Sequence, residues 1–189
     1  MAQPKLVLAS RSPQRRAILE TLGVPFEVRV TDVVEEEEGA PAAVAGENAL
    51  RKAVAGKAAA DEVVLGVDTL VAIELEIWGK PPDEAAARAT LRRLGGRTHE
   101  VVSGVALVEE DGTVRAATAT TQVTFRPLDE PTIEWYLRSG EWEDRAGGYA
   151  IQSRGGALVE RIEGDYLNVV GLPVGTLFGL WPDLLSLAV

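Results

Sequence analysis

Four stretches of the chain carry side chains whose types could perform phosphate chemistry. They supply hydroxyl groups, cations, carboxylates and a carboxamide, which together suit a nucleotide phosphate site with a metal ion. The stretches are Ser10–Arg16, Asp68–Thr69, Gly79–Pro81 and Asp144–Arg154. The motifs G-x-x-x-x-G-K-[ST] and G-x-G-x-x-G after a strand are absent from the sequence, which disfavours a P-loop NTPase and a Rossmann dehydrogenase.

The first stretch connects a short apolar segment to a helix start. Lys5–Leu8 has the character of a buried strand, Ser10 and Ser12 are favoured helix N-caps, and Pro13 suits the first helical position. The turn would present backbone N–H groups, hydroxyls and arginines to an anion at the positive end of a helix. These arginines are Arg11, Arg15 and Arg16. Two interpretations are open here: a phosphate-binding turn, or an ordinary capped helix with solvated arginines.

Asp68 and Lys80 each follow a segment that predicts a strand. Val63–Val67 is apolar throughout, which predicts a central buried strand that ends at Asp68. Open α/β sheets bind their ligands at the carboxyl ends of strands. Pro81 cannot donate to a strand ladder and holds Lys80 extended, where the ammonium could reach a phosphate. A plain solvated lysine is the alternative.

The composition limits the class of protein. The 189 residues are 46% hydrophobic and 25% charged, as in a soluble globular domain. No cysteine is present, which excludes disulfides and thiolate metal sites, and one histidine makes a His-rich zinc site or a Ser-His-Asp triad unfavourable. That histidine, His99, lies in an alternating segment and is expected to be structural or on the surface. No apolar run has transmembrane length and no signal peptide begins the sequence, so a cytoplasmic enzyme is expected.

The charge distribution favours a small anionic ligand over a polymer. The net charge of −10 disfavours a nucleic-acid binder, whose affinity comes mostly from neutralising phosphates. Acidic residues concentrate in Glu35–Glu38, usually a solvated face, although one of them could face a metal or substrate. Any metal is expected to be a hard cation such as Mg²⁺ or Mn²⁺ on carboxylate oxygens.

The remaining pattern predicts an α/β or α+β fold. Strands are expected over Phe26–Val30, Thr98–Val108, Thr113–Phe125 and Ala157–Ile162, and helices over Ala42–Ala60, Asp83–Leu94, Thr132–Leu137 and from Pro173 onward. A hairpin is expected over Leu70–Ile73 and Glu76–Trp78, after Asp68 and Thr69. Strands alternate with helices at first and a long hairpin follows, which indicates a mixed, twisted sheet flanked by helices. No linker or repeat divides the chain, so residues 1–189 are expected to form a single domain, either compact or with two lobes.

Six motifs, from Leu6 to about Leu185, resemble those of the Maf family. They are Leu8–Arg16, Val67–Thr69, Gly79–Pro81, Thr98–Val101, Asp144–Gln152 and Val169–Pro173. The resemblance implies an α/β fold shared with the inosine-triphosphate pyrophosphatases, with two lobes around a central cleft as one form. It also implies a nucleoside triphosphate pyrophosphatase that releases a nucleoside monophosphate and pyrophosphate. Such enzymes need a divalent metal (Mg²⁺ or Mn²⁺) and are often homodimers.

The resemblance also implies roles for individual residues. Asp68 matches the family's catalytic acid, and Ser10, Arg15 and Lys80 match residues that bind substrate phosphates. Lys52 falls on a further charged position of the site and is expected to bind substrate. The implied chemistry is metal-assisted hydrolysis, in which Asp68 acts as general base or as a metal ligand; the sequence does not separate these roles.

Base selection and a second carboxylate complete the implied site. Thr69 and Gln152 match the branch of the family that prefers dTTP and UTP, while the branch acting on 7-methyl-GTP has other residues there. Gln14 stands where the dTTP/UTP branch has arginine, so the resemblance does not imply a strict dTTP/UTP preference. Glu35 is the second candidate metal ligand.

One alternative to the enzyme is a non-catalytic nucleotide sensor that regulates cell division or septum formation. A nucleic-acid-processing factor is disfavoured by the net negative charge of the protein.

Overall fold

A single mixed sheet forms the centre of the computed structural model, which describes residues 4–57 and 59–188. Within these residues seven strands pair in the order β2-β1-β3-β5-β6-β7, with β4 beside β3. The strands are β1 (Lys5–Ala9), β2 (Phe26–Val28), β3 (Glu62–Ile73), β4 (Glu76–Trp78), β5 (Thr98–Val108), β6 (Val114–Phe125) and β7 (Val159–Glu163). The predicted mixed sheet flanked by helices is confirmed.

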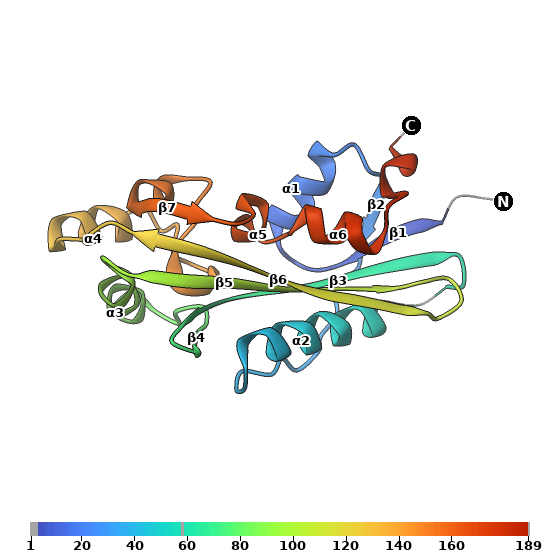
Figure 1. Ribbon diagram of the computed structural model, residues 1–189, viewed down its shortest axis with the longest axis horizontal. Coiled ribbons are helices and arrows are strands. Elements are labelled where there is room, and N and C mark those ends of the chain that lie inside the picture. The colour runs from blue at the N-terminus through green and yellow to red at the C-terminus, as the bar shows by residue number, and fades with distance from the viewer. Residues whose placement is uncertain (1–3, 58, 189) are drawn as a thin grey trace.

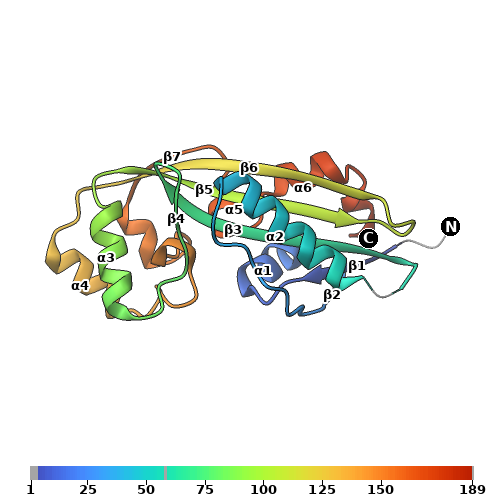
Figure 2. The same cartoon turned by 90° about the horizontal axis from the view of Figure 1, so that it is seen from below.

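Helices cover both faces of the sheet. Figure 1 shows α2 on one face and α1, α5 and α6 on the other, and Figure 2 shows α3 and α4 together at one end. The helices are α1 (Pro13–Thr21), α2 (Pro41–Gly56), α3 (Glu84–Leu94), α4 (Glu130–Leu137), α5 (Tyr166–Val170) and α6 (Val174–Leu180). Three short 3₁₀ turns are η1 (Ala146–Gly148), η2 (Arg154–Leu158) and η3 (Leu184–Leu187). None of the described helices is long and apolar enough to cross a membrane.

Strand β3 is longer than expected, and this changes the position of Asp68. β1 runs parallel to β3 and ends with Ala9 opposite Gly66, while β5 runs antiparallel to β3 and pairs with it as far as Ala72. The β5 ladder therefore supports β3 well beyond the end of β1. The prediction that the strand ends at Asp68 is wrong, because Asp68 lies within β3. It does lie two residues beyond the point where the parallel pairing with β1 stops. The hairpin expected over Leu70–Ile73 and Glu76–Trp78 is confirmed, because these residues form the antiparallel pair of β3 and β4.

The helix predicted over 42–60 is also shorter, ending at Gly56. A Cβ on Gly56 would lie 2.8 Å from a side-chain carbon of Val64 and 3.1 Å from Ala9 Cβ, so this turn of α2 lies directly on the sheet. Lys57 then takes an extended conformation that leads the chain toward β3. Ala58 lies outside the described residues.

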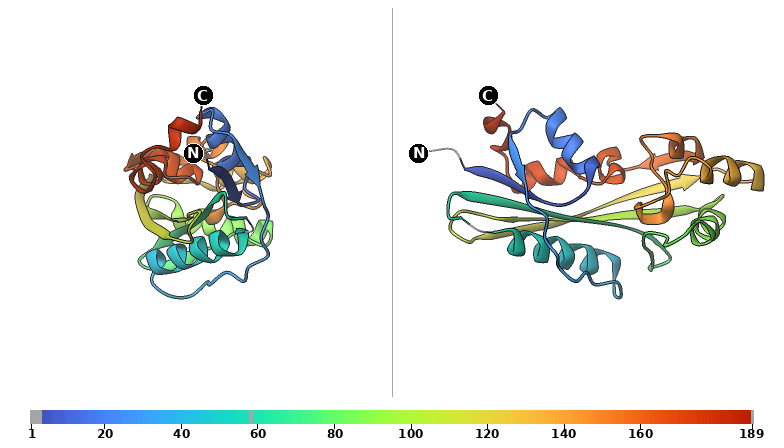
Figure 3. Two further views of the ribbon diagram at one scale, coloured as in Figure 1. Left: turned by 90° about the vertical axis from the view of Figure 1, so that its right-hand side faces the viewer. Right: turned by 180° about the vertical axis from the view of Figure 1, so that it is seen from behind.

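Two of the four hydrophobic cores in the described residues lie on one face of the sheet, toward opposite ends of its long strands. The right-hand view of Figure 3 shows these strands running along the length of the molecule. Alternate β3 residues share a face, so Val67 belongs to the core beneath α1 and α6, and Val71 belongs to the core beside α3 and α4. Thr69 lies on the same face between them. On the other face Asp68 lies between Gly66 and Leu70, beneath α2. The polar residues of β3 therefore lie between two parts of the structure that we call lobes: one contains α1, α2 and α6, and the other contains α3 and α4.

His99 is part of the second core. Its ring meets Phe125 and Tyr149 edge-on, with centroids 4.9 Å and 5.5 Å away, and its Nε2 lies 2.9 Å from the Tyr149 hydroxyl. Only 1% of His99 is exposed, so of the two expected roles the structural one is confirmed and the surface one is wrong. Burial lowers the pKa of His99 from 6.5 to about 4, because the imidazolium would lose its hydration.

We expect this burial to make stability depend on pH. Between pH 6.5 and 4 the unfolded chain binds a proton that the folded chain does not, so the free energy of unfolding falls as the pH falls through this window. The loss between pH 7 and pH 4.5 is expected to be about 2 to 3 kcal/mol. Urea unfolding of the wild type and His99→Gln at both pH values measures it. An equal pH dependence in the two proteins would contradict the assignment, since this is the only histidine of the chain.

Candidate active site

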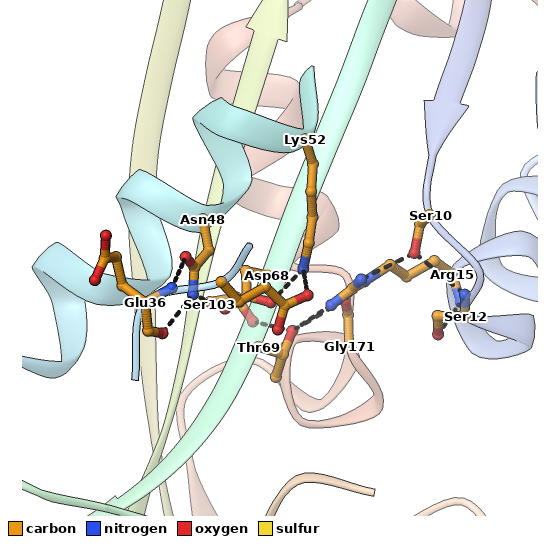
Figure 4. Close-up of polar contacts among 11 residues, drawn as sticks. Ser10, Ser12, Arg15, Glu36, Asn48, Lys52, Asp68, Thr69, Ser103 and Gly171 are labelled. Atoms are coloured by element: carbon orange, nitrogen blue, oxygen red, sulfur yellow. Dashed lines mark hydrogen bonds and ion pairs between the residues drawn. The ribbon is translucent and has the colours of Figure 1, made fainter. Parts of the chain in front are cut away.

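Asp68 is the centre of a buried polar cluster on β3 (Figure 4). Its Oδ1 accepts a hydrogen bond from Lys52 Nζ at 2.7 Å, and its Oδ2 accepts one from Asn48 Nδ2 at 3.2 Å. Only 8% of the residue is exposed. A carboxylate this buried is stabilised as an anion by the ammonium and the carboxamide that contact it.

Lys52 joins two carboxylates that come from different segments. Its Nζ lies 2.7 Å from Asp68 Oδ1 and 2.6 Å from Glu35 Oε1. The Lys52 side chain is 11% exposed, whereas that of Glu35 is 51% exposed. The two acidic oxygens therefore converge on one cationic position, with the Asp68 side buried and the Glu35 side open to solvent.

Helix α2 brings Asn48 and Lys52 to Asp68 because of two features of its sequence. The two residues are four positions apart, which places them on one face of a helix. Small residues Ala49 and Ala53 are fully buried, and no side chain separates them from Gly66 of β3. The helix backbone can therefore approach the sheet closely, so that both polar side chains reach a carboxylate on the strand.

Arg15 forms the second half of the cluster, on the opposite face of β3. Its Nε donates to the Gly171 carbonyl at 2.9 Å, Nη1 donates to Ser10 Oγ at 3.0 Å, and Nη2 donates to Thr69 Oγ1 at 3.1 Å. Burial lowers the pKa of Arg15, and the charges of Asp68 and Glu35 oppose that shift. A guanidinium has five N–H donors and stays protonated in proteins. Three are used within the described part of the chain, which leaves two for an anion.

Thr69 and Gly171 hold this guanidinium in place. Thr69 Oγ1 also lies 2.8 Å from Ser103 Oγ of β5, which fixes the threonine hydroxyl. Gly171 caps the C-terminus of α5 with a φ of 129°, a conformation that favours glycine. Its carbonyl is thereby directed at Arg15. The cation is consequently bound between a strand hydroxyl and the carbonyl end of a short helix.

The turn after β1 is a capped helix start, as expected. Ser12 is the N-cap of α1, its Oγ accepts from Arg15 N at 3.4 Å, and Pro13 occupies the first turn. Ser12 N donates to Ser10 Oγ at 3.2 Å, so fewer backbone N–H groups are free than the sequence suggested. The Ser12 hydroxyl also donates to Gln14 Oε1 at 3.1 Å.

The three arginines of this turn do not gather at one place. Arg11 pairs with Asp32, and Arg16 Nε lies 2.8 Å from Glu20 Oε1; both pairs are exposed. Arg11 and Arg16 therefore match the alternative of solvated arginines, and only Arg15 of the three contacts the Asp68 cluster.

Lys80 and Gln152 are exposed and lie outside the cluster. Lys80 lines a cavity of about 340 Å³ with Trp78 and Thr90. Within the described ranges neither residue forms a hydrogen bond with the Asp68 cluster. In the antiparallel pairing of β3 and β4, Val71 lies opposite Trp78. If this pairing were extended by two residues, Lys80 would lie opposite Thr69. The chain therefore leads Lys80 toward the cluster without bringing it into contact.

The loops that carry Lys80 and Gln152 belong together. Gly147 N donates to the Gly79 carbonyl at 3.1 Å, and a Cβ on Gly148 would lie 3.3 Å from a Pro81 ring carbon. Both residues thus belong to the lobe formed by α3 and α4, whereas Ser10, Arg15 and Lys52 approach from the other lobe. A ligand that contacted all of them would bridge the two lobes.

Comparison with known proteins identifies the family. The sequence profile described as "Maf-like protein" matches residues 5–183. The chain belongs to the Maf family. This confirms the resemblance seen in the six motifs.

Individual relatives in this family are close. The chain is 46% identical over 177 residues to a Bacillus cereus protein named dTTP/UTP pyrophosphatase, covering 92% of each chain. It is also 46% identical over 173 residues to a protein of the same name from Symbiobacterium thermophilum, covering 90% of this chain and 89% of the relative.

Among solved structures the similarity is more distant. A HAM1 protein from Coxiella burnetii is 18% identical, with a TM-score of 0.47 over 82% of this chain and 91% of that chain. A nucleoside-triphosphatase described as dITP/XTP pyrophosphatase, from Mycobacterium abscessus, is 22% identical, with a TM-score of 0.44 over 66% of this chain and 75% of that chain.

Sequence reasoning missed three members of the cluster in this Maf chain. Asn48 could have been found, because it is a carboxamide one turn before Lys52 in an otherwise alanine-rich helix. Gly171 lies in the last of the six motifs but had no role assigned. Ser103 gave no signal, since its place opposite Thr69 depends on the pairing of β3 with β5.

Proposed function

We propose that this protein is a nucleoside triphosphate pyrophosphatase that hydrolyses the bond between the α and β phosphates. The observation that supports this best is the buried Asp68, whose carboxylate accepts hydrogen bonds from Lys52 and Asn48 on one face of β3. The next residue, Thr69, accepts a hydrogen bond from Arg15 on the opposite face. Relatives at 46% identity carry the name dTTP/UTP pyrophosphatase over nearly their whole length. The products would be a nucleoside monophosphate and pyrophosphate.

The substrate proposed is dTTP, UTP or a related nucleotide. Thr69, Gln152 and Gln14 are the proposed specificity residues. Gln14 is half-buried in the first turn of α1, and its carboxamide can both donate to and accept from a pyrimidine edge. The carboxamide lacks the charge of arginine, so we propose that base preference is less strict than in the dTTP/UTP branch.

A divalent cation fits the acidic residues of the cluster. Asp68 and Glu35 direct oxygens at one point, now contacted by Lys52 Nζ. The described ranges hold no group of three or more His, Cys, Asp and Glu side chains that could bind a metal. Mg²⁺ is commonly held by one or two carboxylates together with substrate phosphates, and two carboxylates meet that need. If Lys52 moved away from this point, Mg²⁺ or Mn²⁺ held by the two carboxylates would neutralise phosphate charge and lower the pKa of a coordinated water.

The chain's own residues would supply the other parts of the reaction. Arg15, with two free donors, Ser10 and Lys80 would bind phosphate oxygens and stabilise the charge that develops on them. Lys52 would bind the same charge once it separates from a carboxylate. Asp68 would accept a proton from water or hold the metal. A homodimer and a cytoplasmic location stay predictions.

Product analysis tests the proposal. The protein is incubated with dTTP, UTP, CTP or 7-methyl-GTP and either Mg²⁺, Mn²⁺ or EDTA, and the released phosphate species are identified. Pyrophosphate with the monophosphate, lost in EDTA, is the expected result. Orthophosphate would mean a different bond is cut. Nucleotide binding with no product would favour the sensor, and a preference for 7-methyl-GTP would refute the proposed base selection.

Lys80 gives a separate test of phosphate binding. Lys80→Ala is expected to lower kcat/KM for dTTP about tenfold or more, because a charge-assisted contact to phosphate contributes roughly 1.5–3 kcal/mol. Lys5→Ala is the matched control, since it removes the same charge from an exposed pair with Asp61. Equal effects of the two variants, or unchanged kinetics in Lys80→Ala, would exclude the contact.

A further inference from the structure

Asn48 is a buried carboxamide whose two polar atoms are both engaged. It is 1% exposed. Its Nδ2 donates to Asp68 Oδ2 at 3.2 Å and to the Glu36 carbonyl at 3.0 Å, and its Oδ1 accepts from Glu36 N at 2.7 Å. Figure 4 shows the side chain between the strand that carries Asp68 and the acidic segment. Three separate segments therefore meet at one side chain.

The chemistry of these partners matches a carboxamide. Asp68 Oδ2 and the Glu36 carbonyl need a donor, while Glu36 N–H needs an acceptor. An aspartate at position 48 would satisfy the N–H but would place a second carboxylate against Asp68. An alanine would leave all three groups without this partner in a buried place, which is unfavourable for polar groups.

Two consequences follow for the site. Because Asn48 holds one oxygen of Asp68, the other oxygen is the one that faces Lys52. Because Asn48 also binds both backbone groups of Glu36, the preceding residue Glu35 is kept beside the same ammonium. The Glu36 carboxylate turns away and pairs with Arg51 at 2.6 Å.

Arg51 offers a natural comparison on the same helix. Its Nη1 donates to the Val34 carbonyl at 3.2 Å, and its guanidinium pairs with Glu36 and Glu47. It therefore holds the acidic segment against α2, as Asn48 does. It makes no contact with Asp68 in the described part of the chain.

We propose that Asn48 is a positioning residue for the hydrolytic step. It fixes the orientation of the Asp68 carboxylate and, through Glu36, sets Glu35 beside it. This inference rests on the proposed pyrophosphatase function, because it assigns to Asn48 the geometry in which Asp68 and Glu35 act. Asn48 itself touches neither substrate nor reacting water in this assignment.

The test compares three variants of the full chain with dTTP and Mg²⁺. Asn48→Ala removes every side-chain hydrogen bond of Asn48. Asn48→Asp keeps the acceptor for Glu36 N–H but removes the donor to Asp68 and to the Glu36 carbonyl, and Arg51→Ala loosens the acidic segment alone. We expect kcat to fall about 10- to 100-fold in both Asn48 variants, as for residues that orient metal ligands. The KM, and the Kd of the α,β-methylene analogue of dTTP, should stay within about threefold, and Arg51→Ala should lose less than about threefold in kcat.

Each result decides a different point. If the wild type releases no pyrophosphate, the proposed function fails and this inference falls with it. If the wild type is active but the Asn48 variants match Arg51→Ala, or lose only affinity for the analogue, Asn48 merely holds the segment and the inference alone is overturned. Asn48→Asp, which has nearly the shape of the native residue, decides the matter should Asn48→Ala fail to fold.

Discussion

Replacing Asp68 with asparagine is expected to lower kcat for dTTP by about 10³-fold or more, whether Asp68 is the general base or a metal ligand. Asparagine keeps the shape of the side chain, but it accepts no proton at neutral pH and binds Mg²⁺ weakly. Lys52 keeps its pair with Glu35 at 2.6 Å, so the ammonium is not left without an anion. The fold should therefore survive, as circular dichroism and thermal unfolding would show.

The matched control is Asp61→Asn, the same chemical change at an exposed residue. Asp61 pairs with Lys5 at 2.9 Å and lies in the turn directly before β3, away from the cluster. The kcat of Asp61→Asn should stay within about twofold of the wild-type value, since exposed ion pairs contribute little to stability. A near-wild-type rate in Asp68→Asn would remove Asp68 from the reaction. A large loss in both variants would instead indicate a general effect of charge.

The start of α1 and the extent of β5 were predictable from the sequence, because residues close together in the chain determine such features. The N-cap at Ser12 and the proline after it specify the start of α1, and β5 runs over the residues expected of it. The periodicity of α1 could even have separated its arginines. Arg15 lies three and four residues before Ile18 and Leu19, both buried, so it shares their inward face.

Features that depend on partner strands were not predictable in this way. The apolar run Val63–Val67 stops before Asp68 and so predicts a strand end there, yet β5 continues to pair with β3 as far as Ala72. The contact of Asp68 with Asn48 joins residues 20 positions apart through the packing of α2 on the sheet. Neither residue type nor periodicity reports how closely two elements approach.

The close packing of α2 on β3 depends on glycine at position 66. Gly66→Ala is therefore expected to destabilise the protein by more than about 3 kcal/mol. A Cβ on Gly66 would lie 2.1 Å from the Ala49 carbonyl oxygen and 2.6 Å from Ala53 N. Both are backbone atoms of α2, so no side-chain rotation relieves the clash and the helix must move. Because α2 carries Asn48 and Lys52, any variant that still folds should also lose kcat.

Gly46→Ala makes the same change within α2 and separates this clash from a general effect of alanine. The nearest atom to a Cβ on Gly46 is a Thr118 methyl carbon at 3.6 Å, an ordinary contact. Alanine is the better helix former by up to about 1 kcal/mol, so this variant should be as stable as the wild type or more so. Urea unfolding with unchanged m-values would measure both. If Gly66→Ala unfolded at the wild-type midpoint, α2 would have room to move, and the position of Lys52 beside Asp68 would not depend on tight packing against β3.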